Sequence, residues 1–362
     1  MHTFIKTHFH LKTLISLVLL TSIGSASANS AFEKGVVEKT YTPAQIIENK
    51  NESFPKSYSG SRLEGWALLS YVVAKDGSVN DIEVISHSAV VDTQAEAQRY
   101  LNNLVFSSAI KGEQAVERGY LFTYQAGKYF TGYANDKASR GFISGYDDVN
   151  TLIKEKNFKE AELELAQLFT DHTKNTAEQA LFAWLKSQFY YFQQQWQGFD
   201  EQVKVAYLLR AQLPTDLHYT VVKSALQWFI YKQDFYLAYN AINSLGKIEG
   251  KVFTSKNKIA TTKQVDELLA QTTVINTEIT LHDQQVDYIS LSRANIVLEN
   301  AQNLELVELR CANQVVKFSP SKQIAYAVDP ASRRCGLLLK SRKSEQITLT
   351  QTGEIIVGLS DY

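Results

Sequence analysis

The sequence predicts a multidomain α+β protein in three parts. We expect a small sheet domain backed by a helix over residues 55–126, helical hairpins over 146–250, and an antiparallel β domain over 274–362. Three observations carry this prediction: two apolar runs joined by a tight turn and followed by an amphipathic helix, a helical pattern that recurs along the middle of the chain, and a series of short β-branched segments near its end.

The beginning of the chain has the pattern of a secretory signal over residues 1–28. Lys6 and Lys12 give it a basic start without acidic residues, Leu14–Ile23 is apolar, and the small residues Ala26–Ala28 precede the expected cleavage point. This apolar run is shorter than the roughly 20 residues that a membrane-spanning helix needs. We therefore expect cleavage, export and no stable membrane span in the mature chain.

Charge and composition fit a folded protein that does not bind nucleic acid. The formal net charge is −1, and 44% of the residues are hydrophobic. Proteins that bind nucleic acid need a surplus of basic residues to neutralise phosphates, and this chain has no such surplus. The polar stretch 29–54 is expected to form a lead-in to the first domain.

The first domain is expected to begin with a hairpin. Trp66–Val73 and Val79–Ser86 are rich in β-branched and aromatic residues, which is typical of strands. Lys75–Ser78 between them favours a tight turn in which Gly77 takes a positive φ.

A helix and a third strand are expected to follow. Thr93 and Glu96 have the spacing of a capping box, and an apolar stripe with helical periodicity comes after them. Val116–Tyr124 is expected to be the third strand, with its aromatic residues on one face. The helical stripe consists of Ala97, Tyr100, Leu101 and Leu104.

These residues resemble the C-terminal domain of TonB and the wider TonB-like family. The features that carry the resemblance are Pro55, Tyr58, Leu63–Trp66, Leu68–Val73, Asp76–Val79, Ile82–Ile85, Phe106, Gly112, Val116 and Phe122. The resemblance implies a periplasmic protein of a Gram-negative bacterium. Family members that transduce energy hold outer-membrane transporters by pairing a strand with an extended transporter segment, which is β-augmentation.

The resemblance implies an interaction module whose partners are envelope proteins, outer-membrane transporters among them. We place the contact on the last strand of the domain, because an edge strand offers unpaired backbone groups. The alternative for Tyr120 is that it only packs on the helix. The predicted partner-binding residues are Val116, Arg118, Tyr120, Phe122 and Tyr124.

Two other functions stay open. The first is a working energy transducer of the TonB type. Such transducers have an uncleaved anchor, a long Pro-rich spacer and the domain at the end of the chain, whereas this chain has a cleavable-looking signal, 5 Pro residues and a long extension after the domain. The second is an envelope enzyme with a site that the sequence does not reveal.

The middle of the chain is predicted to be helical, after a glycine-containing linker over 127–145. Amphipathic segments begin at Asn157, Trp196 and Asp234, and aligning Phe158, Trp196 and Phe235 gives steps of 38 and 39 residues. Two helices per step resemble tetratricopeptide-like repeats, which implies a concave partner-binding surface. A plain helical bundle is the alternative. Residues 251–273 are expected to connect this region to the last domain.

Short extended segments near the end of the chain predict a small antiparallel sandwich. Cys311 and Cys335 are the only cysteines, and in an exported protein such a local pair is expected to form a disulfide. The bridge would stabilise the domain by roughly 3 kcal/mol on a chain-entropy account. The expected strands are Val274–Thr280, Gln285–Ser290, Asn295–Leu298, Leu304–Arg310, Val315–Phe318, Ile324–Val328, Leu337–Leu339, Gln346–Leu349 and Ile355–Leu359.

No motif in the sequence predicts catalysis or a cofactor. A serine-hydrolase elbow, a phosphate-binding loop and a zinc-type histidine pair are all absent. We therefore expect no enzymatic activity, no metal site and no cofactor. The histidines that follow the signal are His87, His172, His218 and His282, which are far apart in sequence.

Overall fold

The fold is described from a computed structural model, which places residues 41–51, 63–126, 138–250 and 253–359. Within these ranges the chain contains both α-helices and antiparallel sheets, which confirms the α+β class. From Thr42 onward the described residues belong to one compact unit. The expected signal, most of the lead-in and the first part of the linker lie outside the described residues.

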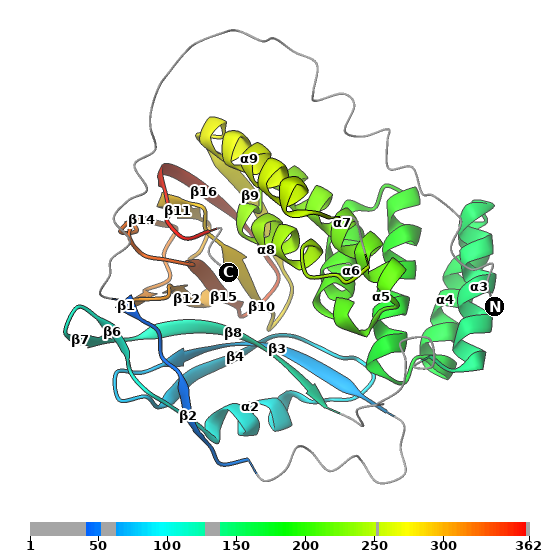
Figure 1. The fold of residues 1–362 in the computed structure, drawn as a ribbon, viewed down its shortest axis with the longest axis horizontal. Coiled ribbons are helices and arrows are strands. Elements are labelled where there is room, and N and C mark those ends of the chain that lie inside the picture. The colour runs from blue at the N-terminus through cyan, green and yellow to red at the C-terminus, as the bar shows by residue number, and fades with distance from the viewer. Residues whose placement is uncertain (1–40, 52–62, 127–137, 251–252, 360–362) are drawn as a thin grey trace, which may run out of the picture. The chain divides into compact units, whose positions relative to one another are not determined.

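A three-stranded antiparallel sheet, here called the front sheet, forms the first part. Its strands are β3 (Gly65–Val73), β4 (Val79–His87) and β8 (Arg118–Ala126), in the order β4-β3-β8. The central strand β3 is buried at all but one of its residues. Helix α2 (Gln94–Asn102) lies along one face of this sheet (Figure 1). The turn residue Gly77 has a φ of +86°, as predicted.

The start of α2 differs from the predicted capping box. Thr93 is the N-cap residue, but its side chain makes no capping hydrogen bond. It is fully buried, and its Cγ2 atom lies where a Cβ on Gly65 would come within 2.5 Å, so the side chain packs against β3 instead. The N–H of Gln94 bonds to the carboxylate of Asp92 at 3.0 Å.

The segment expected to form a single third strand, Val116–Tyr124, is split in two. Val116 ends a separate short strand and β8 starts at Arg118. Gly112, in the turn before Val116, has a φ of +64°, which closes a small hairpin ahead of β8. The short strands are β1 (Tyr41–Thr42), β2 (Ile46–Asn49), β5 (Leu104–Phe106), β6 (Ala109–Lys111) and β7 (Gln114–Val116).

The middle of the chain consists of helices in antiparallel pairs (Figure 1). The second helix of each pair begins at Phe158, Trp196 or Phe235, within one residue of the starts that the sequence predicts. A further helix packs on the last pair. The elements are α3 (Arg140–Lys154), α4 (Phe158–His172), α5 (Thr176–Phe192), α6 (Trp196–Leu208), the 3₁₀ turn η2 (Arg210–Gln212), α7 (Thr215–Tyr231), α8 (Phe235–Leu245) and α9 (Ser255–Gln271).

The turn inside each helical pair has the same backbone geometry. Lys156, Gln194 and Gln233 have φ values of 60°, 59° and 57°. In each turn the N–H of the next residue bonds to the carbonyl five positions back, as Asn157 does to Leu152 at 2.9 Å. This bond pattern around a left-handed residue is a Schellman ending. One turn is therefore repeated at the steps of 38 and 39 residues.

Two segments expected to link domains are helical. α3 begins at Arg140, inside the predicted linker 127–145, and α9 fills most of the predicted connector 251–273. Gly141 and Gly145 lie in α3, and a Cβ on either residue would come within 2.9 Å of a side chain of α4. These glycines allow the two helices to approach closely, so here glycine does not mark a flexible link.

The last part, here called the β domain, is a sandwich of two four-stranded antiparallel sheets. One sheet has the order β10-β15-β12-β13 and the other β14-β11-β16-β9. Apolar side chains from both sheets form one buried cluster. The strands are β9 (Ile275–Leu281), β10 (Val286–Ser290), β11 (Arg293–Glu299), β12 (Leu304–Arg310), β13 (Val315–Phe318), β14 (Gln323–Ala327), β15 (Gly336–Ser341) and β16 (Glu345–Ile355).

The predicted disulfide between Cys311 and Cys335 is confirmed. It joins the end of β12 to the residue before β15. The strand expected at Ile355–Leu359 does not form, because β16 runs on to Ile355 and the chain then leaves the sheet. The N–H of Ile356 bonds to the carbonyl of Ser292 at 3.0 Å.

The repeated left-handed turn predicts a stabilising substitution. A non-glycine residue in this conformation is strained by roughly 1–2 kcal/mol, whereas glycine adopts it without strain but adds entropy to the unfolded chain. Gln194→Gly and Gln233→Gly should each raise the free energy of unfolding by about 0.5–1 kcal/mol. Urea denaturation measures the change.

Gln167→Gly is the matched control, because Gln167 is exposed in the interior of α4. There glycine should lower the free energy of unfolding by about 1 kcal/mol. A loss of stability at the turn positions as large as that of the control would contradict the prediction.

Candidate partner-binding site

Strand β8 is an edge of the front sheet. It pairs with β3 without a register shift from Arg118 to Ala126. Within the described chain the sheet has no further strand beyond it. An edge strand turns backbone N–H and C=O groups outward at every second residue. β8 is also the strand to which the sequence assigns the partner contact.

The aromatic residues predicted to bind a partner face helix α2 and β3. Phe122 stacks on Tyr100 of α2 with ring centroids 5.7 Å apart, and the ring of Tyr124 lies 5.5 Å from Tyr100. Tyr120 stacks on Tyr71 of β3 at 5.3 Å. Tyr124 is only 2% exposed. Phe122 and Tyr124 thus pack on the helix, whereas Tyr120 packs between Tyr71 and Phe106 of β5, and both Tyr120 and Phe122 are half-buried.

The other two predicted residues lie near the start of β8. Arg118 is 8% exposed, and its guanidinium carbon lies 4.2 Å from the ring centroid of Tyr120. Val116 belongs to β7, where it pairs with Ala109 and is half-buried. Both side chains pack within the chain.

The predicted partner-binding residues do not include Leu121 and Thr123, which alternate with the three aromatic residues along β8. Leu121 pairs with Ser70 and Thr123 with Leu68, on the sheet face opposite α2. Leu121 is 39% exposed. Strand alternation is a sequence signal for these residues, but it does not tell which face other parts of the chain will cover.

Along the outer edge of β8, some outward backbone groups have a hydrogen-bond partner in the described chain and others do not. The N–H of Gly119 donates to the carbonyl of Cys311, in the β domain, at 2.9 Å. Residues two apart on a strand point the same way, so Leu121 and Thr123 also turn their backbone groups outward. Among the residues that the structure describes, no backbone hydrogen bond joins Leu121 or Thr123 to an element other than β3.

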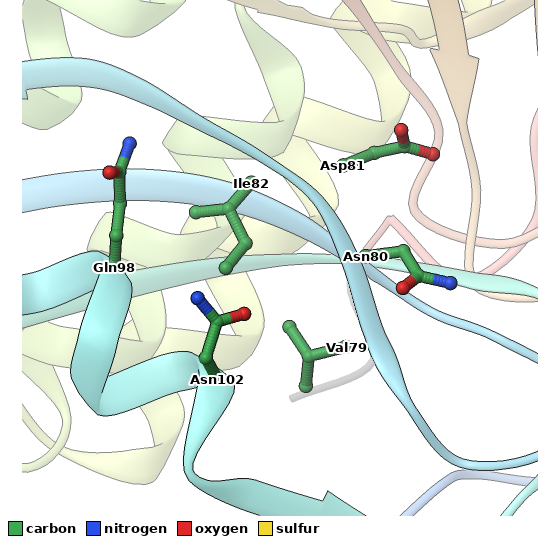
Figure 2. Close-up of a pocket in the computed structure, with 6 residues that line it drawn as sticks. All are labelled: Val79, Asn80, Asp81, Ile82, Gln98 and Asn102. Carbon is green, nitrogen blue, oxygen red and sulfur yellow. The ribbon is translucent and has the colours of Figure 1, made fainter.

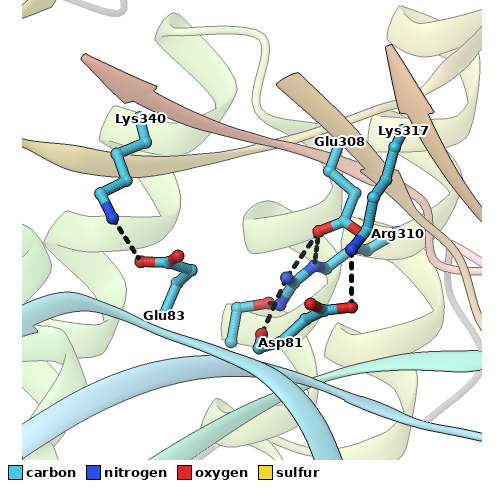
Figure 3. Close-up of polar contacts among 7 residues, drawn as sticks. Asp81, Glu83, Glu308, Arg310, Lys317 and Lys340 are labelled. Atoms are coloured by element: carbon cyan, nitrogen blue, oxygen red, sulfur yellow. Dashed lines mark hydrogen bonds and ion pairs between the residues drawn. The ribbon is translucent and has the colours of Figure 1, made fainter. Parts of the chain in front are cut away.

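The opposite edge, β4, is less suited to strand addition. Its register against β3 shifts at two places, and Asp81 has a φ of +48°. Bulges of this kind protect edge strands from further pairing. Its carboxylates are also held by the β domain, Asp81 by Lys317 at 2.9 Å and Glu83 by Lys340 at 3.5 Å (Figure 3).

A buried ion pair holds β12 on the front sheet (Figure 3). Arg310 donates from Nε and Nη2 to Oε2 of Glu308 at 2.9 and 2.6 Å. It also donates to the hydroxyl of Ser70 at 2.7 Å and to the carbonyl of Asp81 at 2.9 Å. The side chains of Arg310 and Glu308 are 1% and 0% exposed. Charges this deeply buried must stay paired for the fold to be stable.

Two further polar contacts join the parts of the chain. Glu64, just before β3, accepts hydrogen bonds from the N–H and the hydroxyl of Thr176 at 3.0 and 2.8 Å. Thr176 starts α5, where the helix dipole favours a carboxylate. Arg293 of β11 donates to the carbonyls of Leu269 and Thr272 at 2.6 and 2.7 Å, which satisfies the end of α9.

An open hollow of about 280 Å³ lies between β4 and α2 (Figure 2). Its only ionisable lining residue is Asp81, whose carboxylate is already bonded to Lys317. General acid–base chemistry needs positioned groups that exchange protons with a substrate, so this lining does not suggest catalysis. The lining consists of Val79, Asn80, Asp81, Ile82, Gln98 and Asn102.

A group of charged side chains joins α6, α8 and β10. Lys204 bonds to Asp200 at 2.8 Å, and Asp234 accepts a hydrogen bond from a serine of β10 at 2.7 Å. Burial raises the pKa of Asp234 and that of Asp287. Burial also opposes ionisation of Asp200, but the charge of Lys204 and hydrogen bonds from Lys204 and Trp228 outweigh it and lower the pKa. The group therefore holds one ion pair beside two carboxylates that resist ionisation.

The buried ion pair predicts unequal effects of single and double substitution. Arg310→Met should lower the free energy of unfolding by about 3–5 kcal/mol, because it leaves Glu308 charged and buried. Adding Glu308→Leu should recover much of this loss, because no charge is then left unpaired. Lys263→Ala, which removes an exposed ion pair with Glu267 on α9, should cost less than about 1 kcal/mol. Equal losses in the single and double variants, measured in urea, would count against the prediction.

The raised pKa of Asp234 predicts a pH-dependent effect. A group whose pKa is higher in the folded state stabilises the fold below its unfolded pKa, and that contribution is lost as the pH rises through the folded pKa. Asp234→Asn can still cap α8. The free energy of unfolding of this variant, relative to that of the wild type, should therefore be higher at pH 7 than at pH 4. Urea denaturation at both values tests this, with Asp283→Asn on an exposed turn as control. The prediction would be wrong if the variant were more stable relative to the wild type at pH 4 than at pH 7.

Within the described ranges, no group of three or more His, Cys, Asp or Glu side chains is placed to share a metal ion. None of the helices there is long and apolar enough to cross a membrane. Comparison with known protein families matches none of them, and comparison with curated proteins finds no match. The TonB-like and tetratricopeptide-like resemblances therefore stay predictions.

Proposed function

We propose that the chain is a non-enzymatic interaction protein of the periplasm that binds an extended segment of an envelope partner along the outer edge of β8. One observation carries the proposal: β8 is in unbroken register with a buried strand, and its outward groups at Leu121 and Thr123 have no partner among the described residues. Strand addition takes its affinity from such backbone groups and its selectivity from the side chains beside them.

The packing behind β8 favours this role. Tyr120, Phe122 and Tyr124 hold the strand against β3 and α2, so its outer edge is rigid before a partner arrives. A preorganised edge lowers the entropy lost on binding. In this proposal the three aromatic residues position the strand, and the exposed side chain of Leu121 contacts the partner.

The periplasmic location and the class of partner rest on the sequence. The signal-like start supports export, and the resemblance of residues 55–125 to TonB-like domains supports outer-membrane transporters as partners. An energy transducer is the alternative. The mass of the protein purified from its native envelope separates the two: a chain starting near Asn29 supports export, and an intact Met1 in the membrane fraction supports the transducer.

Photo-crosslinking from the β8 edge tests the proposal. A benzophenone amino acid at position 121 should form a crosslink to an envelope protein in intact cells. The matched control is position 163, because Leu163 is an exposed leucine on a different element, α4. Thr123→Pro removes one outward N–H without removing a hydrogen bond to β3, and it should reduce the crosslink at 121 about fivefold or more. Thr123→Ala should leave it unchanged.

Two outcomes would reject strand addition at β8. One is a crosslink of equal yield at positions 121 and 163. The other is a crosslink at 121 that Thr123→Pro does not reduce while circular dichroism shows the variant to be folded.

A further inference from the structure

The β domain already occupies one end of the β8 edge. The carbonyl of Cys311 accepts the outward N–H of Gly119 at 2.9 Å. A partner strand that pairs along the whole of β8 would need this same N–H. Cys311 therefore stands in the position of the first residue of an added strand.

The segment Cys311–Gln314, here called the cap turn, is held firmly from behind. Its two ends bond to each other, N–H of Cys311 to the carbonyl of Gln314 at 2.8 Å. The N–H of Ala312 bonds to the carbonyl of Arg333 at 2.7 Å, and the disulfide ties Cys311 to Cys335. The cap turn is thus a rigid piece of the β domain rather than a loose loop.

Contacts from Arg310 bring the cap turn onto the front sheet. The guanidinium binds Ser70 of β3 and the carbonyl of Asp81 of β4 (Figure 3). The stem of Arg310 lies directly over Gly119, where an added Cβ would approach the Cβ of Arg310 to 2.6 Å. Only a residue without a side chain at position 119 lets the strand and the cap turn come this close.

We propose that the cap turn is an internal competitor for the β8 edge, which closes the strand at Gly119 and, among the described residues, leaves the outward backbone groups of Leu121 and Thr123 open until a partner displaces it. This inference rests on the proposed function, because it concerns the same edge. At the far end of the open stretch, the side chain of Gln212 in η2 donates to that of Gln125 at 3.1 Å. From Leu121 to Gln125 the edge spans roughly 16 Å.

Two substitutions loosen the cap turn by different means. Gly119→Ala adds a methyl group that pushes the Arg310–Cys311 backbone away from β8, and alanine is compatible with a strand. Glu308→Leu with Arg310→Met removes the hydrogen bonds to Ser70 and Asp81 without leaving a buried charge. Lys322→Ala changes an exposed residue of the β domain outside the cap turn and away from the β8 edge, and serves as the control.

The crosslink yield at position 121 is the first measurement. Loosening the cap turn should raise it about fivefold, the equivalent of one net backbone hydrogen bond. Hydrogen exchange of the peptide that contains Gly119 is the second measurement, made on the full-length protein alone. It should become faster in both loosened variants and stay unchanged in Lys322→Ala.

The two measurements separate the possible failures. Faster exchange with an unchanged or reduced crosslink would overturn the competition while leaving strand addition in place. Unchanged exchange in both loosened variants would overturn the cap itself. If exchange is faster but no variant crosslinks at all, the cap exists and the proposed partner contact fails.

Discussion

The buried pair of Arg310 and Glu308 is the constraint on which the arrangement of the described chain depends. A guanidinium that is 1% exposed needs a partner for each of its donors. The front sheet supplies two of them, the hydroxyl of Ser70 and the carbonyl that a β4 irregularity turns outward at Asp81. The same arginine requires a glycine at position 119. The side chain of Arg310 thus contacts all three strands of the front sheet, at Ser70 of β3, Asp81 of β4 and Gly119 of β8.

Beside apolar packing of Trp66 and Ile275 against the helices, further polar and directional contacts join the parts. Glu64 meets the start of α5, and Arg293 meets the end of α9, both at backbone groups that a helix terminus leaves unsatisfied. Apolar contacts alone tolerate sliding, whereas hydrogen bonds to buried charged groups are lost when geometry changes. These contacts explain why the described residues from Thr42 onward form one compact unit although the sequence reads as separate segments.

The two edges of the front sheet differ in how far they are protected from pairing with another strand. β4 is irregular and carries carboxylates bound to lysines of the β domain, which protects it from pairing. β8 is regular throughout, and among the described residues its one backbone hydrogen bond to the β domain is at Gly119. If protection from aggregation were the only requirement, both edges would be expected to be irregular or covered. The difference between them is the physical basis for placing a partner on β8.

Local patterns in the sequence determined the hairpin of β3 and β4, the position of α2, the first residues of α4, α6 and α8, and the Cys311–Cys335 bridge. Each of these depends on residues near one another in the chain, through periodicity, turn chemistry or loop closure. The tertiary structure alone decided that the aromatic face of β8 turns toward α2, that Thr93 packs rather than caps, and that Gly119 bonds to Cys311. These features depend on contacts between distant residues, such as the bond from Arg310 to Ser70 across 240 positions, and no local pattern encodes which faces will meet.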